Sequence, residues 1–190
     1  MREYSALTLT RLETGARVAE PMTPGRVTFD DPAFSVMTDL REVSAATTRP
    51  EETIDAAHAQ MIRRGVRLLF VLDEGSVAGV ITATDLLGEK PIRFMQARGV
   101  SHAEILVEDI MTPASMLEAL SILEVAQMRV GHIVATIKAV GRKHLMVSED
   151  GGRRIRGLFS ASQIARQLGM EVQTFEVARS FADIEAALVR

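Results

Sequence analysis

The stretch Val66-Arg-Leu-Leu-Phe-Val-Leu-Asp-Glu-Gly-Ser-Val-Ala-Gly-Val-Ile-Thr82 decides the fold. Its run from Leu68 to Leu72 and its return run from Val77 to Ile81 are short and apolar, which is typical of buried strands. Glu74-Gly75 lies between the two runs and supplies the positive φ angles that a tight hairpin needs. The stretch therefore predicts a buried β-hairpin.

A helix is predicted on each side of this hairpin. Before it, apolar residues recur at helical spacing on one face, at Ile54, Ala57, Met61 and Ile62. Gly65 follows this helix and suits a left-handed cap. After the hairpin, Thr82-Ala-Thr-Asp85 has the spacing of a capping box and leads into Leu86-Leu87. The predicted order is helix, strand, strand, helix.

The same order occurs a second time in the chain. A helix with an apolar face precedes Gly141, at Val130, Ile133, Val134 and Ile137. Leu145 to Val147 and Ile155 to Phe159 read as the two strands, with Asp150-Gly151-Gly152 as the turn. Ser160-Ala-Ser-Gln163 stands where the first copy has its capping box, and it also fits one.

The composition excludes several classes of protein. The 190 residues are 47% hydrophobic and 25% charged, with a formal net charge of −3, which argues against binding to nucleic acid or an anionic membrane. The chain has no cysteine, so disulfides, thiolate metal sites and thiol nucleophiles are excluded. The four histidines are scattered, and we predict no metal site. Without a signal peptide or a long apolar run, we expect a cytoplasmic protein.

Several motifs resemble those of a known family. Gly79-Val-Ile-Thr-Ala-Thr-Asp85 and Asp109-Ile-Met-Thr-Pro113 are similar to the motifs of a cystathionine-β-synthase (CBS) domain pair, also called a Bateman module. The resemblance implies a stand-alone module of the mixed α/β (α+β) class, with two tandem β-α-β-β-α repeats packed pseudo-symmetrically. The corresponding divisions are an N-terminal extension at 1–36, repeat 1 at 37–99, repeat 2 at 100–170 and a strand-helix tail at 171–190.

The resemblance also implies a function. Members of the family bind adenosine ligands such as AMP, ADP, ATP or S-adenosylmethionine in up to two clefts, and they regulate rather than catalyse. We therefore expect an energy-sensing module, not an enzyme, that forms a homodimer and acts on a separate, unidentified protein. It needs no cofactor besides the regulatory nucleotide. The alternative is a ligand-independent interaction scaffold.

Family motifs place a first ligand site at Arg67, Val80, Thr82, Thr84 and Asp85. A carboxylate accepts hydrogen bonds from two ribose hydroxyls at once, and an arginine favours a phosphorylated ligand. A second site is expected at Lys143, His144, Ser160, Ser162 and Gln163. Because Gln163 is uncharged where the first copy has an aspartate, this site should bind about tenfold more weakly.

The ends and one insertion complete the expectations. Proline-separated stretches at Leu7 to Leu9 and Val27 to Phe29 suggest short edge strands. Residues 171–177 read as a strand, and Ser180 as the cap of a short helix. The stretch 114–129 is longer than its counterpart in the first copy, and an insert there would displace the loop beside the adenine.

Overall fold

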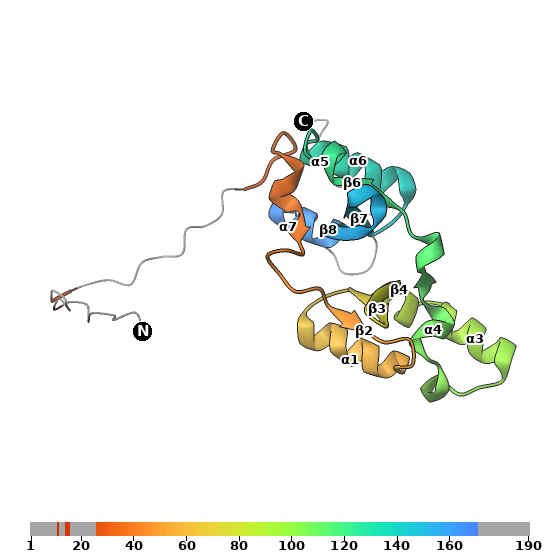
Figure 1. Ribbon diagram of the computed structural model, residues 1–190. Helices are drawn as coiled ribbons and strands as arrows, with labels where there is room; N and C mark the ends of the chain where they lie inside the picture. The colour runs from red at the N-terminus through yellow and green to blue at the C-terminus, as the bar shows by residue number, and fades with distance from the viewer. Residues whose placement is uncertain (1–10, 12–13, 16–25, 171–190) are drawn as a thin grey trace, which may run out of the picture.

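The protein folds into two similar halves, each made of one sheet with helices (Figure 1). The structure is a computed structural model that describes residues 26–170 together with residues 11, 14 and 15. The main elements of the first half are β2 (Thr47–Thr48), α1 (Ile54–Arg64), β3 (Leu68–Asp73), β4 (Ser76–Thr82), α2 (Ala83–Leu87), α3 (Lys90–Arg98) and α4 (Val107–Ile110). Those of the second half are β6 (Ala119–Ser121), α5 (Ile122–Val125), α6 (Val130–Val140), β7 (His144–Glu149), β8 (Arg154–Ser160) and α7 (Ala161–Gln167).

Both predicted hairpins form. Strand β3 pairs antiparallel with β4, and β7 pairs antiparallel with β8, each with a register shift at the equivalent place. Glu74 and Asp150 adopt φ angles of 45° and 53°, and glycines with positive φ follow both. The mixed α+β class and the order helix, strand, strand, helix are confirmed in both halves.

The two hairpin helices pack as predicted except at one residue. All four apolar residues of the α6 face are buried, and so are Ile54, Ala57 and Met61 of α1. Ile62, in contrast, is 69% exposed, so its assignment to the core is wrong. Successive helical residues are rotated by about 100°, so Ile62 falls outside the face that Met61 occupies. Both helices end at a left-handed glycine, Gly65 and Gly141.

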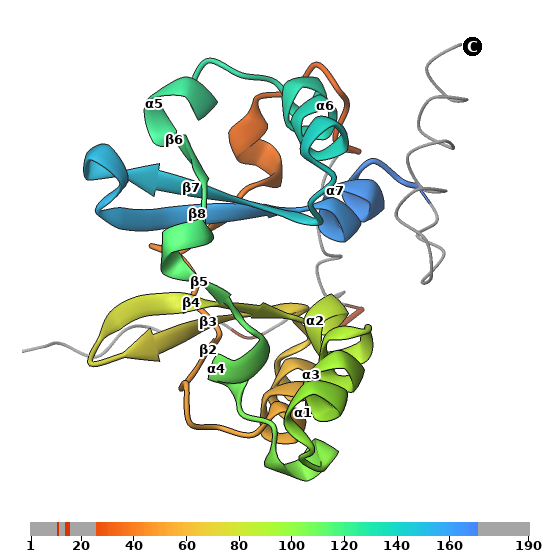
Figure 2. The ribbon, with the colours of Figure 1, turned by 90° about the vertical axis from the view of Figure 1, so that its right-hand side faces the viewer.

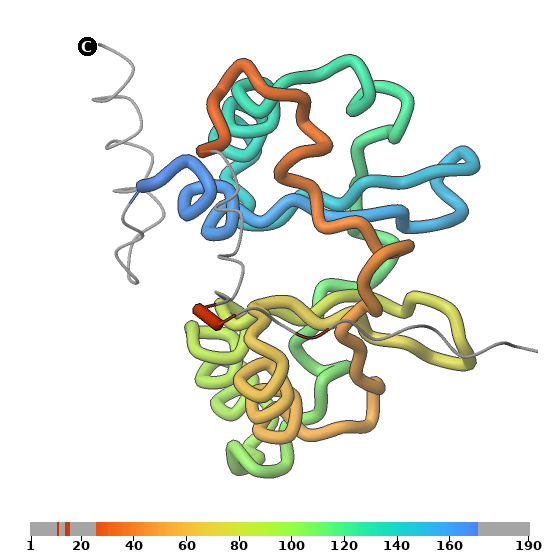
Figure 3. Tube along the Cα trace, turned by 90° about the vertical axis from the view of Figure 1, so that its left-hand side faces the viewer, coloured from red at the N-terminus to blue at the C-terminus, as the bar shows by residue number. Residues whose placement is uncertain are grey.

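Each half receives a strand from the other part of the chain. The sheets have the orders β2-β3-β4-β5 and β1-β8-β7-β6. Strand β1 (Thr38–Asp39) precedes the first half but pairs with β8, and β5 (Thr112–Pro113) precedes the second half but pairs with β4. Figure 3 shows the orange segment after β1 passing from one half to the other. The leading segment of each repeat thus completes the opposite sheet.

The same exchange fixes the starts of α1 and α6. The N–H of Ile54 donates to the carbonyl of Ile105 at 3.1 Å, and the N–H of Val130 donates to that of Asp31 at 2.9 Å. The N–H of Gly131 donates to the carbonyl of Phe29 at 2.9 Å. The strand predicted at Val27 to Phe29 is therefore wrong, because this irregular segment caps α6 instead of extending a sheet.

The two halves meet through their sheets. In Figure 2 the sheets face each other at the centre, with α1 and α6 on the outer sides. A cluster of buried side chains fills the space between the sheets, with three members from the first half and Met146 from the second: Leu68, Phe70, Val80 and Met146. Larger clusters lie between each sheet and its helices. The pseudo-symmetric packing places the open ends of both hairpins beside the opposite half.

Some elements lie outside the repeated pattern. The described residues also contain the short 3₁₀ helices Ala33–Val36, His102–Glu104, Ala114–Met116 and Asp150–Gly152. No helix in the described part of the chain is long and apolar enough to span a membrane. The strands predicted at 7–9 and 171–177, and the helix predicted after Ser180, lie outside the described residues.

Candidate functional site

Two clefts lie between the halves at equivalent positions. The first, which we call the Asp85 cleft, has a volume of about 370 Å³. The second, the Arg67 cleft, has a volume of about 520 Å³. The polar side chains of the Asp85 cleft are those of Thr82, Thr84, Asp85, Thr112, Arg142, Lys143 and His144. Those of the Arg67 cleft are Thr38, Ser44, Arg64, Arg67, His144, Ser160, Ser162, Gln163 and Arg166.

The structure groups the predicted site residues differently from the sequence analysis. Val80, Thr82, Thr84 and Asp85 line one cleft together, but Arg67 lines the other, with Ser160, Ser162 and Gln163. Lys143 in turn lies in the Asp85 cleft, and His144 lies in both. In each cleft, the hydroxyl groups and the acid or amide come from one half. The cation that precedes the first hairpin strand comes from the other half.

Local backbone contacts explain why the cations stand at the cleft edges. The carbonyl of Arg67, just before β3, accepts from the N–H of Ala83 at 3.0 Å. The carbonyl of Lys143, just before β7, accepts from the N–H of Ala161 at 2.9 Å. In each half, the residue before the first hairpin strand is thereby tied to the start of the helix that follows the hairpin. Its side chain then lies where the opposite sheet approaches.

Asp85 is fully partnered in the structure. Its Oδ2 accepts from the N–H of Thr82 at 2.8 Å and from the Thr82 hydroxyl at 2.7 Å, which completes a capping box. Its Oδ1 lies 2.7 Å from Nζ of Lys90, which also donates to the carbonyl of Ile110 at 2.9 Å. Asp85 can therefore cap the helix through Oδ2 and also bind a ligand through Oδ1, if the ligand replaces Lys90 at that oxygen.

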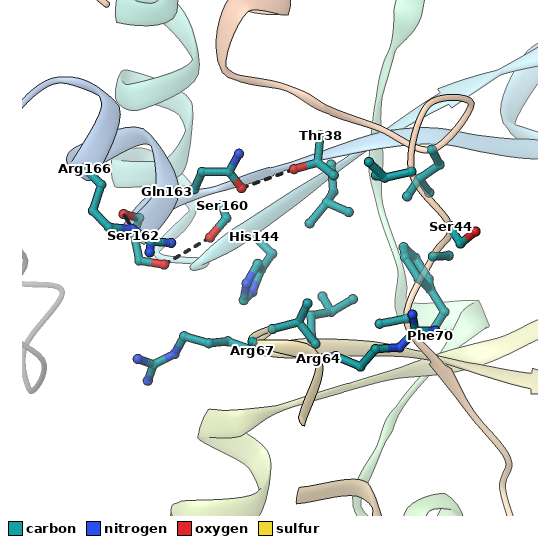
Figure 4. Close-up of a pocket in the computed structure, with 18 residues that line it drawn as sticks. Thr38, Ser44, Arg64, Arg67, Phe70, His144, Ser160, Ser162, Gln163 and Arg166 are labelled. Atoms are coloured by element: carbon teal, nitrogen blue, oxygen red, sulfur yellow. Dashed lines mark hydrogen bonds between the residues drawn. The ribbon is translucent and has the colours of Figure 1, made fainter. Parts of the chain in front are cut away.

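The equivalent position in the second half has no capping box. Oε1 of Gln163 accepts from the Thr38 hydroxyl at 3.2 Å, and the hydroxyls of Ser160 and Ser162 lie 3.1 Å apart (Figure 4). Ser160 makes no side-chain cap bond, so the capping box predicted there is wrong. The amide of Gln163 is engaged by the leading strand of the first repeat, which the local pattern did not include.

The Arg67 cleft is cationic. Arg64, Arg67 and Arg166 contribute three guanidinium groups, and among the described residues no Asp or Glu lines the cleft. Within residues 26–170, none of these arginines has an ion pair, and Arg166 donates from Nε to the carbonyl of Ser162 at 3.3 Å. In the Asp85 cleft, by comparison, Arg142 is neutralised by Glu118 at 2.7 Å and Asp85 by Lys90.

His144 stands between the two clefts. Burial, together with the nearby charges of Arg67 and Lys143, lowers the pKa of His144 to about 4, whereas Asp85 acts in the opposite direction. The imidazole is therefore neutral at pH 7. It lines both clefts without adding a third positive charge to those of Arg67 and Lys143.

Part of the stretch 114–129 lies beside the Asp85 cleft. Residues 112–117 run along the Asp85 cleft, where Thr112, Met116 and Leu117 contribute to the wall. Farther along, the stretch forms α5, whose Val125 is buried against the second half's own core. Because Met116 and Leu117 line the Asp85 cleft while α5 lines neither cleft, the displacement of a loop beside the ligand stays a prediction.

Sequence reasoning missed several lining residues. These are Arg64, Arg142 and Arg166, and reasoning from the sequence also missed Lys90, which lines neither cleft but pairs with Asp85 from the start of α3. Thr38 and Thr112 are equivalent residues of the exchanged strands β1 and β5. A signal was present for the last pair, since Met37-Thr38 and Met111-Thr112 repeat the same dipeptide before each half.

Comparisons with known proteins agree with this architecture. Residues 33–91 match the family described as CBS domain. A structure of an uncharacterised conserved protein from Pyrococcus horikoshii superposes with a TM-score of 0.56 at 23% identity, covering 78% of this chain and 99% of that one. A CBS-domain containing protein from Agrobacterium tumefaciens superposes with a TM-score of 0.51 at 18% identity, covering 67% and 93%.

A third structure carries a ligand. CBSX2, which comes from Arabidopsis thaliana, was solved in complex with AMP and superposes with a TM-score of 0.51 at 17% identity, covering 72% of this chain and 94% of that one. A search of curated proteins finds no match. The chain contains a CBS domain at residues 33–91, and its two halves together have the fold of a CBS-domain pair.

Proposed function

We propose that the protein is a regulatory module that binds an adenosine nucleotide of the AMP, ADP or ATP type in the Asp85 cleft. The observation that carries the proposal is the placement of the Asp85 carboxylate and the Lys143 ammonium on opposite walls of one cleft between the halves. The solved AMP complex of a protein with the same fold supports the choice of ligand class. The proposed role is regulatory rather than catalytic.

The chemistry of the cleft suits this ligand. A carboxylate accepts from the 2′ and 3′ hydroxyls of a ribose, and ammonium and hydroxyl groups pair with phosphate oxygens. Asp85 supplies the first group, and Lys143 and Thr84 supply the second. The volume of about 370 Å³ is in the usual range for small-molecule sites.

Signalling follows from the origin of the cleft walls. Thr82, Thr84 and Asp85 belong to the first half, and Arg142, Lys143 and His144 belong to the second. A ligand that bonds to both walls stabilises one relative position of the halves and shifts the population of module shapes. We infer that a separate protein responds to this shape.

We also propose a homodimer. Large apolar side chains on α1, α2, α3 and α6 are exposed, at 69% for Ile62, 67% for Leu87, 57% for Ile92 and 49% for Val140. Such side chains are common at subunit interfaces. Light scattering at micromolar concentration is expected to give twice the chain mass of 20.8 kDa; the monomer mass would count against the dimer.

A thermal-shift panel tests the ligand. Saturation at a hundredfold over the dissociation constant adds about 2.7 kcal/mol, or roughly 5 to 10 °C for a chain of this length. We expect such a shift with one of AMP, ADP or ATP, and its loss in Asp85→Ala. Asp109→Ala is the matched control, because Asp109 also caps a short helix, through Leu106 N at 2.8 Å, but lines neither cleft.

One observation favours a second candidate, a ligand-independent scaffold. Both carboxylate oxygens of Asp85 already have partners in Thr82 and Lys90. If no adenosine ligand shifts the melting temperature of the folded protein, the Asp85 network is purely structural. A scaffold then docks its partner equally well with and without nucleotide, and Asp85→Ala leaves that docking unchanged.

A further inference from the structure

The Arg67 cleft brings together three arginines from different parts of the chain. Arg64 and Arg166 lie in the last turns of α1 and α7, where the helix dipole favours a cation. The dipole does not require either side chain to line this cleft. Arg67 lies in no helix. Yet all three side chains line the same cleft, and none has an ion pair among residues 26–170.

Their arrangement is that of an anion site. In Figure 4, Arg67 and Arg166 approach the same end of the cleft from opposite walls, with His144 between the walls, and Arg64 stands farther along the Arg67 wall. Guanidinium groups that share one cleft without an acid repel one another, and an anion between them removes that cost. Each guanidinium also offers paired N–H donors that match phosphate oxygens.

The neutral groups of the cleft indicate which part of a ligand is recognised. The hydroxyls of Ser160 and Ser162 bond only to each other among the described side chains, so each keeps capacity for a phosphate oxygen. Gln163 uses Oε1 to accept from Thr38, and the described residues that line the cleft include no carboxylate for a ribose diol. Recognition in this cleft is therefore directed at negative charge rather than at a sugar.

We propose that the Arg67 cleft binds a chain of two or more phosphate groups and selects for the number of phosphates, not for a nucleoside. Three guanidinium groups spread along a cleft of about 520 Å³ match several phosphates better than one. Free pyrophosphate or tripolyphosphate and the phosphate end of a nucleoside triphosphate share this chemistry. The inference concerns the cleft opposite the Asp85 cleft, and it adds phosphate-number selectivity to the proposed nucleotide-binding function.

Isothermal titration of the full chain with phosphate, pyrophosphate, tripolyphosphate, AMP and ATP tests the proposal. Tripolyphosphate is expected to bind at least tenfold more tightly than phosphate. Arg67→Gln and Arg64→Gln should each weaken tripolyphosphate by about tenfold, whereas Arg63→Gln should leave it unchanged. Arg63 is a matched control because it is also exposed in the last turn of α1 but does not line the cleft.

The titrations with tripolyphosphate and with ATP distinguish a free phosphate chain from one that belongs to a nucleotide. Equal affinity for tripolyphosphate and ATP indicates that phosphate alone is recognised; tighter ATP binding that Arg67→Gln also weakens indicates a nucleotide in the same cleft. The first result supports the proposal, and the second overturns it, because the proposed cleft does not select for a nucleoside. The proposal is also overturned if tripolyphosphate binds no more tightly than phosphate, or if Arg63→Gln and Arg67→Gln weaken tripolyphosphate binding equally.

Failure here is distinguishable from failure of the proposed function. Asp85→Asn is expected to weaken AMP and leave tripolyphosphate unchanged, because Asp85 lies in the other cleft. If AMP depends on Asp85 but tripolyphosphate does not bind, the proposed function stands and this inference is wrong. If tripolyphosphate binds through Arg67 but the binding of no nucleoside ligand depends on Asp85, this inference stands and the proposed function is wrong.

Discussion

The Asp85 cleft and the Arg67 cleft occupy equivalent places but carry different chemistry. Thr82, Thr84 and Asp85 on one side correspond to Ser160, Ser162 and Gln163 on the other. In the first cleft Asp85 is present and Arg142 is paired with Glu118, whereas in the second, within residues 26–170, no acid is present and three arginines have no ion pair. The two halves thus share their backbone geometry, but different side chains give the two clefts different charges.

The largest expected difference between the halves concerns the exchanged strands. A Cβ at Gly79 would overlap the carbonyl oxygen of Thr112 and lie 3.0 Å from Sδ of Met111, while a Cβ at Gly157 would lie 2.7 Å from the carbonyl oxygen of Thr38. We expect Gly79→Ala to lower the free energy of unfolding by about 2 to 3 kcal/mol and Gly157→Ala by about 1 to 2 kcal/mol. Urea denaturation measures both, and an unaffected Gly79→Ala would contradict the close pairing of β4 with β5.

A pH titration tests the residue that the clefts share. Because the pKa of His144 is lowered to about 4 in the folded state from an ordinary value of 6.5, the unfolded chain takes up the proton first as the pH falls. The stabilisation present above pH 6.5 is therefore lost between pH 6.5 and 4, by at most about 3 kcal/mol.

His144→Gln should remove this part of the pH dependence. His58→Gln is the control, since His58 lies on α1 and lines neither cleft. The free energy of unfolding from denaturant titrations at several pH values gives the comparison. An identical pH profile for wild type and His144→Gln would mean that the imidazole is not held neutral between the clefts.

Lys90 is expected to oppose ligand binding in the Asp85 cleft. Its Nζ occupies Oδ1 of Asp85 at 2.7 Å, so a ribose must displace it. Lys90→Met should strengthen AMP binding by about three- to tenfold, up to about 1.4 kcal/mol. Arg93→Met is the control because Arg93 pairs with Glu89 on the same helix, away from both clefts. Weaker AMP binding in Lys90→Met would instead make Lys90 a phosphate ligand.

The smallest expected difference lies in the helix caps. Thr82 accepts from the N–H of Asp85 at 3.3 Å and Ser160 makes no such bond. Thr82→Ala should lower the free energy of unfolding by about 1 kcal/mol. Ser160→Ala should change it by no more than about 0.5 kcal/mol. Thermal unfolding of the two variants side by side makes the comparison; equal losses would restore the capping box that the sequence pattern suggested for Ser160.

Local patterns predicted the hairpins and their helices well. The apolar runs beginning at Leu68 and Leu145 and the turns at Glu74 and Asp150 are determined by neighbours in sequence, so the repeat was readable. The exchanged strands β1 and β5 span two residues each and have no periodicity to detect. Their pairing depends on contacts between distant parts of the chain.

The predicted site residues line two clefts, but they are grouped differently from the prediction. Thr82, Thr84 and Asp85 do share a cleft, because they lie within one turn of chain. Arg67 and Lys143 were each assigned to their own repeat, whereas the facing sheets bring them to the opposite one. The contact of Thr38 with Gln163 joins residues 125 positions apart, which no local motif contains.

Calorimetric titration with AMP tests the central claim, that the two clefts differ in ligand chemistry, most directly. The account predicts one AMP per chain for wild type, with affinity reduced by tenfold or more in Asp85→Asn and unchanged in Gln163→Leu. Two equal AMP sites per chain, or an affinity that Asp85→Asn leaves intact, would contradict it.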